Sequence, residues 1–156
     1  MSNIVLLLSG PNLNLLGSRQ PAIYGTATLD DHVDAARVAA GRHGLEIEHV
    51  QANSEGPLIE AIHSARERCA AIVINPGALT HYAWGLADAL SCFDGPIVEV
   101  HLSNPNAREA WRHTSVVSPV ATGSIMGFGG EGYRLAVEAV AVALGRGALG
   151  RGEPRG

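Results

Sequence analysis

The chain has 156 residues, a formal net charge of −4 and 11 cationic side chains, all of them arginine. This length predicts one domain, which would bury roughly two thirds of the surface that the unfolded chain exposes. The lack of a basic cluster argues against nucleic acid as a partner, and the absence of lysine excludes Schiff-base catalysis by a lysine amine.

Apolar patterns along the chain predict alternating strands and helices. In chain order they predict a strand at 4–8, a helix at 29–42, a strand at 45–50, a helix at 57–68, a strand at 71–74, a helix at 82–92, a strand at 97–100, a fifth strand near 118–126 and a helix at 132–144. The strands at 4–8, 71–74 and 97–100 are unbroken apolar runs, as expected for strands covered on both faces of a parallel sheet. The alternation predicts a doubly wound α/β fold with helices on both sides of a five-stranded sheet.

Local signals refine the ends of these elements. Thr28 followed by Asp31 is a capping signature for the helix at 29–42, and Pro57 suits the first turn of the next helix. Residues 146–156, rich in glycine and arginine, predict a disordered tail, which leaves a single domain at 1–145.

The sequence predicts neither a metal site nor a membrane segment. Cys69 and Cys92 fall in helical patterns without CxxC or Cys/His ligand spacing, which favours packing roles in a reducing compartment. The apolar run near the N-terminus is far shorter than the ~20 residues of a membrane span. We therefore expect a cytoplasmic protein whose partners are small molecules or copies of itself.

Polar side chains follow three of the predicted strands. These residues are Ser9 to Asn12 after the first strand, Asn75 to Gly77 after the third, and His101 to Asn104 after the fourth. Since ligands of parallel sheets bind beyond the carboxyl ends of the strands, we expect the side chains to meet in one crevice. The alternative for any one of them is a role in a turn or a helix cap.

The segment 17–25 has the composition of a mobile lid, with glycines at both ends and Arg19 and Tyr24 between them. A tyrosine pKa of ~10 leaves little phenolate at neutral pH, and a nearby cation can lower it by ~1–3 units. Arg19 could be that cation. Taken alone, Tyr24 could equally be a packed loop residue.

Four long blocks give the chain a resemblance to a known family over nearly its whole length. They are SGPNLNLLGSRQPAIYG at 9–25, QANSEGPLIEAIH at 51–63, INPGALTHYAWGLADAL at 74–90 and EVHLSNPNAREAWRHTSVVSP at 99–119. In this order they resemble the type II 3-dehydroquinate dehydratases. The resemblance implies a flavodoxin-like fold, no metal or other cofactor, and an anti elimination of water that converts 3-dehydroquinate into 3-dehydroshikimate.

The resemblance also assigns roles by position. Tyr24 matches the base, Arg19 the cation that supports its phenolate, and Asn12 the residue that holds a water against the enolate oxygen. His101 matches the acid and Glu99 the carboxylate that orients it. The matched substrate-binding residues are Asn75, His81, Leu102 through its backbone, Ser103 and Arg112.

The resemblance also implies an oligomer, and this chain departs from the family's pattern at a few positions. Asp88 matches a residue that reaches the site of a neighbouring subunit, and we expect trimers that assemble into dodecamers. Departures from the usual residues are Ser9, Gln20, Ala52 and Ala87, none of which is a proposed catalytic group. Ala87 stands where an arginine often precedes the aspartate, so a charge next to Asp88 is missing from the expected subunit contact.

Two other functions fit parts of the pattern. A flavodoxin-like binding or signalling module would share the strand order, although Pro11 to Asn14 replace its phosphate loop and Asn75 replaces a phosphoacceptor aspartate. A family member that has lost activity is the other alternative. The remaining histidines at 32, 43, 49 and 63 are interpreted as surface or satisfied core residues, and His113 as a support of the fold or an interface.

Overall fold

Five parallel strands form one central sheet in the computed structural model, which describes residues 2–18 and 20–145, apart from the side chains of Ile23 and Tyr24. The strands are β1 (Ile4–Ser9), β2 (Glu46–Gln51), β3 (Ala71–Asn75), β4 (Ile97–His101) and β5 (Gly123–Met126), in the order β2-β1-β3-β4-β5. This is the strand order of flavodoxin-like folds. The predicted fold class is therefore confirmed.

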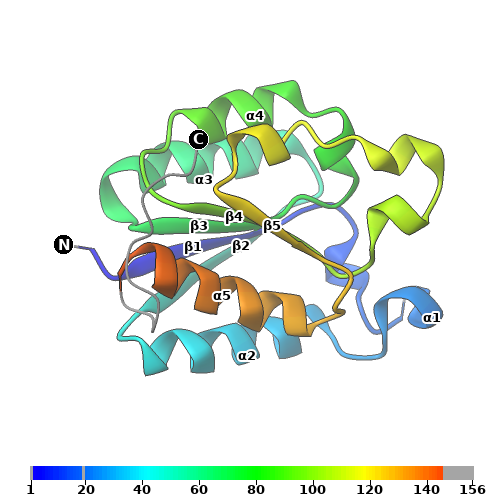
Figure 1. Ribbon diagram of the computed structural model, residues 1–156, viewed down its shortest axis with the longest axis horizontal. Helices are drawn as coiled ribbons and strands as arrows, with labels where there is room; N and C mark the ends of the chain where they lie inside the picture. The colour runs from blue at the N-terminus through cyan, green and yellow to red at the C-terminus, as the bar shows by residue number, and fades with distance from the viewer. Residues whose placement is uncertain (1, 19, 146–156) are drawn as a thin grey trace.

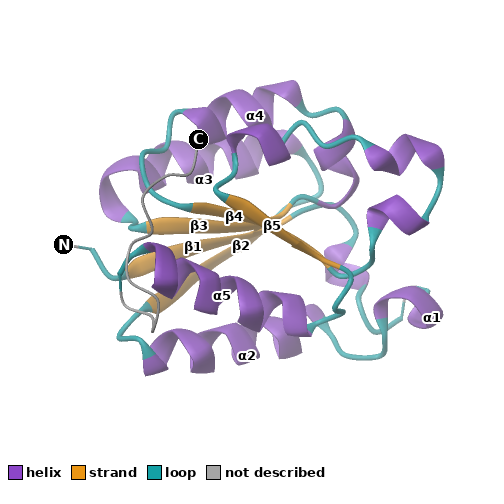
Figure 2. Cartoon of the chain, in the orientation of Figure 1, coloured by secondary structure: helices purple, strands orange, loops and turns teal. Residues whose placement is uncertain are grey.

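Helices cover both faces of the sheet (Figures 1 and 2). Helices α2 (Leu29–Arg42) and α5 (Glu131–Ala143) pack together on one face, and α3 (Glu55–Arg68) and α4 (Trp84–Ser91) pack together on the other. The short helix α1 (Pro21–Tyr24) lies at the end of the sheet where the strands finish. The predicted tail at 146–156 lies outside the described residues.

Strand β1 explains why the first apolar run is unbroken. Val5 and Leu7 belong to the core under α2 and α5, whereas Leu6 and Leu8 belong to the core under α3 and α4. Since successive side chains point to opposite faces, a central strand between two helix layers must be apolar at every position.

The capping signature correctly predicts the start of α2. The Oγ1 atom of Thr28 accepts from the backbone N–H of Asp31 at 3.2 Å, and Asp31 Oδ2 accepts from the N–H of Thr28 at 2.9 Å. Both bonds satisfy amides that the helix itself leaves without a partner.

Three elements start at least two residues away from the predicted position. Helix α3 starts at Glu55, so Pro57 is its third residue, still within the first turn where amides lack helical partners. Helix α4 starts two residues late because 3-10 helix η2 (Gly77–His81) precedes it. Strand β5 is shorter than 118–126 because 3-10 helix η5 (Ser118–Val120) occupies its predicted start.

Within the described residues, no helix combines the length and the apolar character that crossing a membrane requires.

Candidate active site

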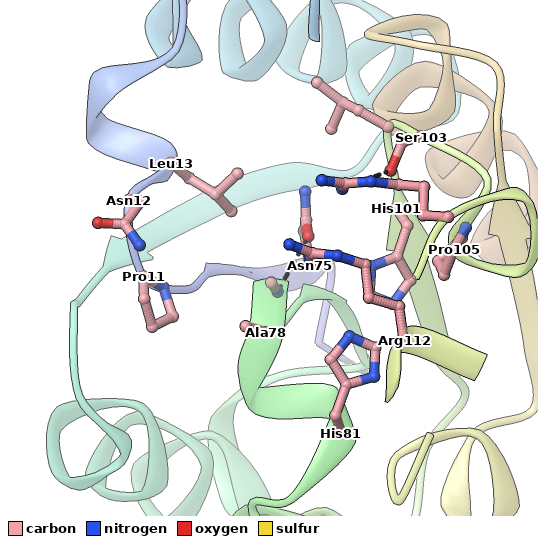
Figure 3. A pocket seen from close by; sticks show the side chains of 13 residues that line it. Pro11, Asn12, Leu13, Asn75, Ala78, His81, His101, Ser103, Pro105 and Arg112 are labelled. Atoms are coloured by element: carbon pink, nitrogen blue, oxygen red, sulfur yellow. Dashed lines mark hydrogen bonds between the residues drawn. The ribbon is translucent and has the colours of Figure 1, made fainter. Parts of the chain in front are cut away.

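A pocket lies at the carboxyl ends of β1, β3 and β4, and seven of the predicted site residues line it (Figure 3). These seven are Asn12, Asn75, His81, His101, Leu102, Ser103 and Arg112. Figure 3 shows side chains from separate loops converging on one space. The topological prediction of a shared crevice is therefore correct for most of the residues at the strand ends, whereas Ser9, Gly10, Pro76 and Asn104 do not line the pocket.

The other four predicted residues lie elsewhere. Glu99 is buried behind His101, and Asp88 is exposed on α4, outside the pocket. Arg19 lies outside the described residues. Tyr24 is the last residue of α1, and its side chain is likewise not described.

Close packing of two loops builds the floor of the pocket. The N–H of Gly10 donates to the carbonyl of Asn75 at 2.8 Å, and a Cβ at Gly10 would lie only 2.4 Å from the carbonyl oxygen of Pro76. Only glycine permits this approach. Gly77 faces Pro11 across the same contact with a φ of +57°, a left-handed conformation that favours glycine.

His101 in the pocket wall is paired with the buried carboxylate of Glu99, two residues earlier on β4 and so on the same face. The Nε2 atom of His101 lies 2.7 Å from Oε2 of Glu99. A carboxylate can only accept hydrogen bonds, so Nε2 carries a proton and Nδ1 is the nitrogen left to exchange a proton with a ligand.

Hydroxyl groups surround Glu99, which is fully buried. Thr80 donates to Oε2 at 2.5 Å, Ser118 donates to Oε1 at 2.5 Å, and Ser115 lies within reach of both oxygens. Burial alone would raise the pKa of Glu99. The hydrogen bond and charge of His101, with those from Ser118 and Thr80, outweigh burial and lower that pKa to about 2. Glu99 is therefore ionised at neutral pH.

Arg112 and His81 line the pocket, and both side chains contact Trp111. Arg112 is held from two sides, because its Nε donates to Glu109 at 2.5 Å and its guanidinium lies 4.0 Å from the ring centre of Trp111. His81 contacts the same Trp111 edge-on, and its Nδ1 donates to the carbonyl of Thr114 at 2.7 Å. Nε2 of His81 thus remains for a ligand.

Arg108 is a pocket residue that sequence reasoning missed. It lines the pocket, and its guanidinium donates to Ser103 Oγ at 3.3 Å. Its spacing of four from Arg112 was the available signal. Arg108 lies between two short 3-10 helices, η3 (Pro105–Ala107) and η4 (Ala110–His113), so no single helical period relates its side chain to that of Arg112.

The lining favours an anionic, oxygen-rich ligand. Among the described residues that form it are two arginines and two histidines, and none of them is a carboxylate. Paired arginines suit a carboxylate ligand, and the amides of Asn12 and Asn75 suit hydroxyl or carbonyl oxygens. Nowhere in residues 2–18 or 20–145 do three His, Cys, Asp or Glu side chains gather as a metal-binding group.

The interpretation of His32 as a surface or satisfied core residue is wrong. Its side chain is buried, stacks on Tyr133 at 5.7 Å, and its Nε2 has no hydrogen-bond partner among the described residues. Burial lowers the pKa of His32 despite the neighbouring charges of Asp31 and Glu131. His43 and His49 do have partners, namely Glu138 and Ser9.

Comparison with known proteins gives one consistent family. Residues 3–141 match the family model described as dehydroquinase class II. The chain is 53% identical over 141 residues to 3-dehydroquinate dehydratase 1 of Corynebacterium efficiens, covering 90% of this chain and 93% of that relative. It is 54% identical over 138 residues to 3-dehydroquinate dehydratase 2 of Pseudomonas aeruginosa, covering 88% and 93%.

A solved structure agrees with this match. The type II dehydroquinase from Propionibacterium acnes superposes with a TM-score of 0.86 at 45% sequence identity, covering 91% of this chain and 98% of that one.

Proposed function

The chain belongs to the class II dehydroquinase family, and from that premise we propose that it removes water from 3-dehydroquinate through an enolate, with Tyr24 as base and His101 as acid. As a member of this family the chain is a 3-dehydroquinate dehydratase, a hydro-lyase of the shikimate pathway. Membership removes the alternative of a flavodoxin-like binding or signalling module. The observation that carries the mechanism is the His101–Glu99 pair in the wall of a cationic pocket.

The first step is removal of a proton from the carbon beside the ketone. Tyr24 takes this proton as a phenolate, and the charge of Arg19 lowers the pKa of its hydroxyl. The electron pair of the broken C–H bond moves onto the ketone oxygen and forms an enolate. Asn12, on the pocket rim, holds a water against that oxygen and so stabilises the developing charge.

The second step expels the hydroxyl group. The enolate electrons re-form the ketone and create the C=C bond as the C–O bond breaks. His101 donates its Nδ1 proton to the departing oxygen, which leaves as water. Before this transfer, the ionised carboxylate of Glu99 stabilises the imidazolium. The hydroxyl groups of Thr80 and Ser118 help to keep this buried carboxylate ionised.

Substrate binding uses the remaining pocket residues. Arg112 grips the substrate carboxylate with two parallel hydrogen bonds. Asn75, His81, Ser103 and the backbone of Leu102 bind the hydroxyl groups. The fixed orientation of Arg112 by Glu109 and Trp111 supports this role, because little side-chain freedom is left to lose on binding.

We further propose that the chain forms trimers that assemble into a dodecamer, in which Asp88 reaches the site of a neighbouring copy. Asp88 and Trp84 are one turn apart on α4, so they share a face. Trp84 is 70% exposed, which supports burial of this face against another copy.

The test separates the two proton transfers. In D₂O, an enolate that forms reversibly exchanges the substrate hydrogen beside the ketone, and NMR detects the exchange. His101→Asn should exchange this hydrogen while forming no product. Tyr24→Phe should do neither. Exchange by Tyr24→Phe at the wild-type rate would show that another group is the base.

A further inference from the structure

Tyr133, on α5, is the largest fully buried side chain of the described residues, and its hydroxyl lies directly behind the pocket. The Nδ2 atom of Asn75 donates to this hydroxyl at 3.2 Å. On the other side, the Tyr133 hydroxyl lies 3.4 Å from Ser9 Oγ, which is itself 2.9 Å from Nε2 of His49. A buried chain of hydrogen bonds thus connects Asn75 to β2.

The direction of this chain follows from the chemistry of its members. An amide N–H₂ only donates, so the Tyr133 oxygen accepts from Asn75 and must pass its own proton on. Ser9 is the partner within reach, and Ser9 Oγ in turn can donate to His49 Nε2 in the tautomer that carries its ring proton on Nδ1. Burial raises the pKa of Tyr133, and burial together with Arg37 lowers the pKa of His49 against the opposing charge of Asp30. The hydroxyl therefore stays protonated, and the neutral imidazole can accept.

A second bond completes the constraint on Asn75. Its Oδ1 accepts from the backbone N–H of Gly77 at 3.2 Å. With Oδ1 turned toward Gly77 and one Nδ2 hydrogen turned toward Tyr133, an exchange of the amide oxygen and nitrogen would set Nδ2 against the Gly77 N–H. It would also require the Tyr133 hydroxyl to turn its proton away from Ser9 and toward the amide. The second Nδ2 hydrogen is then the one left for a ligand in the pocket that Asn75 lines.

We propose that Tyr133 is a positioning residue for substrate binding, whose hydroxyl fixes the Asn75 amide so that the pocket offers an N–H donor to a hydroxyl or ketone oxygen of the substrate. This inference rests on the proposed function, in which Asn75 binds the substrate. Tyr133 contacts no substrate itself and acts through Asn75. A flipped amide would present an acceptor at the same point, and a substrate oxygen without a hydrogen to give would be repelled.

A double-mutant cycle tests this role, because coupling appears only if the two residues act as one unit. Tyr133→Phe keeps the ring that stacks on His32 and removes only the hydroxyl. It should raise KM for 3-dehydroquinate about 3–10-fold, the equivalent of one hydrogen bond, with kcat within about twofold of wild type. In an Asn75→Ala background, Tyr133→Phe should change KM by less than about 1.5-fold.

Two further variants distinguish positioning from a loss of packing. Val137→Ala removes buried volume from the same helix and the same core without touching the hydrogen-bonded chain, and it should leave KM unchanged. Ser9→Ala removes the acceptor for the Tyr133 proton and should raise KM about 2–3-fold. It provides the test should Tyr133→Phe fail to fold.

Three results would overturn the proposal. An unchanged KM in a folded Tyr133→Phe variant would do so. So would an equal rise in KM with and without Asn75, or an equal rise in Val137→Ala, because both indicate a general structural effect. These results leave the proposed function intact, whereas an unchanged KM in Asn75→Ala would refute the substrate role of Asn75 as well.

Discussion

His101 Nε2 and Glu99 Oε2 lie 2.7 Å apart, and the carboxylate half of this pair has no exposure to solvent. The contact fixes which ring nitrogen of His101 faces Glu99 and which remains for a ligand. It also places a carboxylate that is ionised at neutral pH beside an imidazole that, in the proposed mechanism, must become positive to act as an acid.

Glu99→Gln should therefore lower kcat about 10²-fold with little change in KM, because the neutral amide stabilises the imidazolium less well. Steady-state kinetics on 3-dehydroquinate measure both parameters. Glu138→Gln is a matched control, since Glu138 makes the same 2.7 Å contact with His43 away from the pocket. Equal losses in the two variants, or none in Glu99→Gln, would contradict the role of Glu99.

The depressed pKa of Glu99 predicts how stability depends on pH. The pKa is about 2 in the folded chain against 4.5 as the ordinary value, so the stabilisation is fully present above pH 4.5 and is lost as the pH falls toward 2. The shift corresponds to about 3 kcal/mol of unfolding free energy. Chemical denaturation at several pH values should show a steeper acid loss in wild type than in Glu99→Gln. Parallel curves would contradict the ionised, buried carboxylate.

The loop contact at Gly10 should tolerate no side chain. Gly10→Ala places a Cβ 2.4 Å from a backbone oxygen, so the loops after β1 and β3 must separate. We expect a loss of about 2 kcal/mol or more in unfolding free energy and a raised KM. Gly41→Ala, in helix α2 with open space around it, should instead stabilise by about 0.5–1 kcal/mol. Thermal and denaturant unfolding compare the two, and a stable Gly10→Ala would refute the contact.

Arg112→Ala should weaken substrate binding as well as turnover, because the substrate carboxylate that we assign to Arg112 is present in the ground state. A charged hydrogen-bond pair predicts a rise in KM of about 10–100-fold. Arg134→Ala breaks a comparable Arg–Glu pair, with Glu131 at 2.8 Å on the exposed side of α5, and should leave KM within about twofold. An unchanged KM in Arg112→Ala would contradict the proposal that Arg112 binds the substrate carboxylate.

Much of the fold was predictable because its signals are local or periodic. The unbroken run of β1 reflects burial on two faces, and the Thr28–Asp31 signature marks the start of α2. The start of α4 was predicted two residues early because apolar periodicity does not register the 3-10 helix before it.

Some residues of the site could likewise be predicted from the sequence, and others could not. Residues at the carboxyl ends of strands, such as Asn75 and His101, were predictable because parallel strands end at one edge. Arg108 was not, since an irregular segment carries it into the pocket. The Nε2 atom of His32 lacks a hydrogen-bond partner among the described residues because the ring is buried against Tyr133, and no spacing in the sequence encodes that packing.

The roles of Tyr24 and Arg19 remain predictions from the family resemblance. The measurement that tests the central claim most directly is the rise in absorbance of the conjugated enone product when wild type, Tyr24→Phe and Tyr82→Phe are mixed with 3-dehydroquinate. Tyr82 is an exposed tyrosine outside the pocket, so its variant is the control. We predict a wild-type rate that survives borohydride and chelator, an equal rate in Tyr82→Phe, and a loss of about 10³-fold in Tyr24→Phe with substrate affinity preserved. A Tyr24→Phe variant that kept most of the rate, or a wild-type rate abolished by borohydride or chelator, would contradict the account.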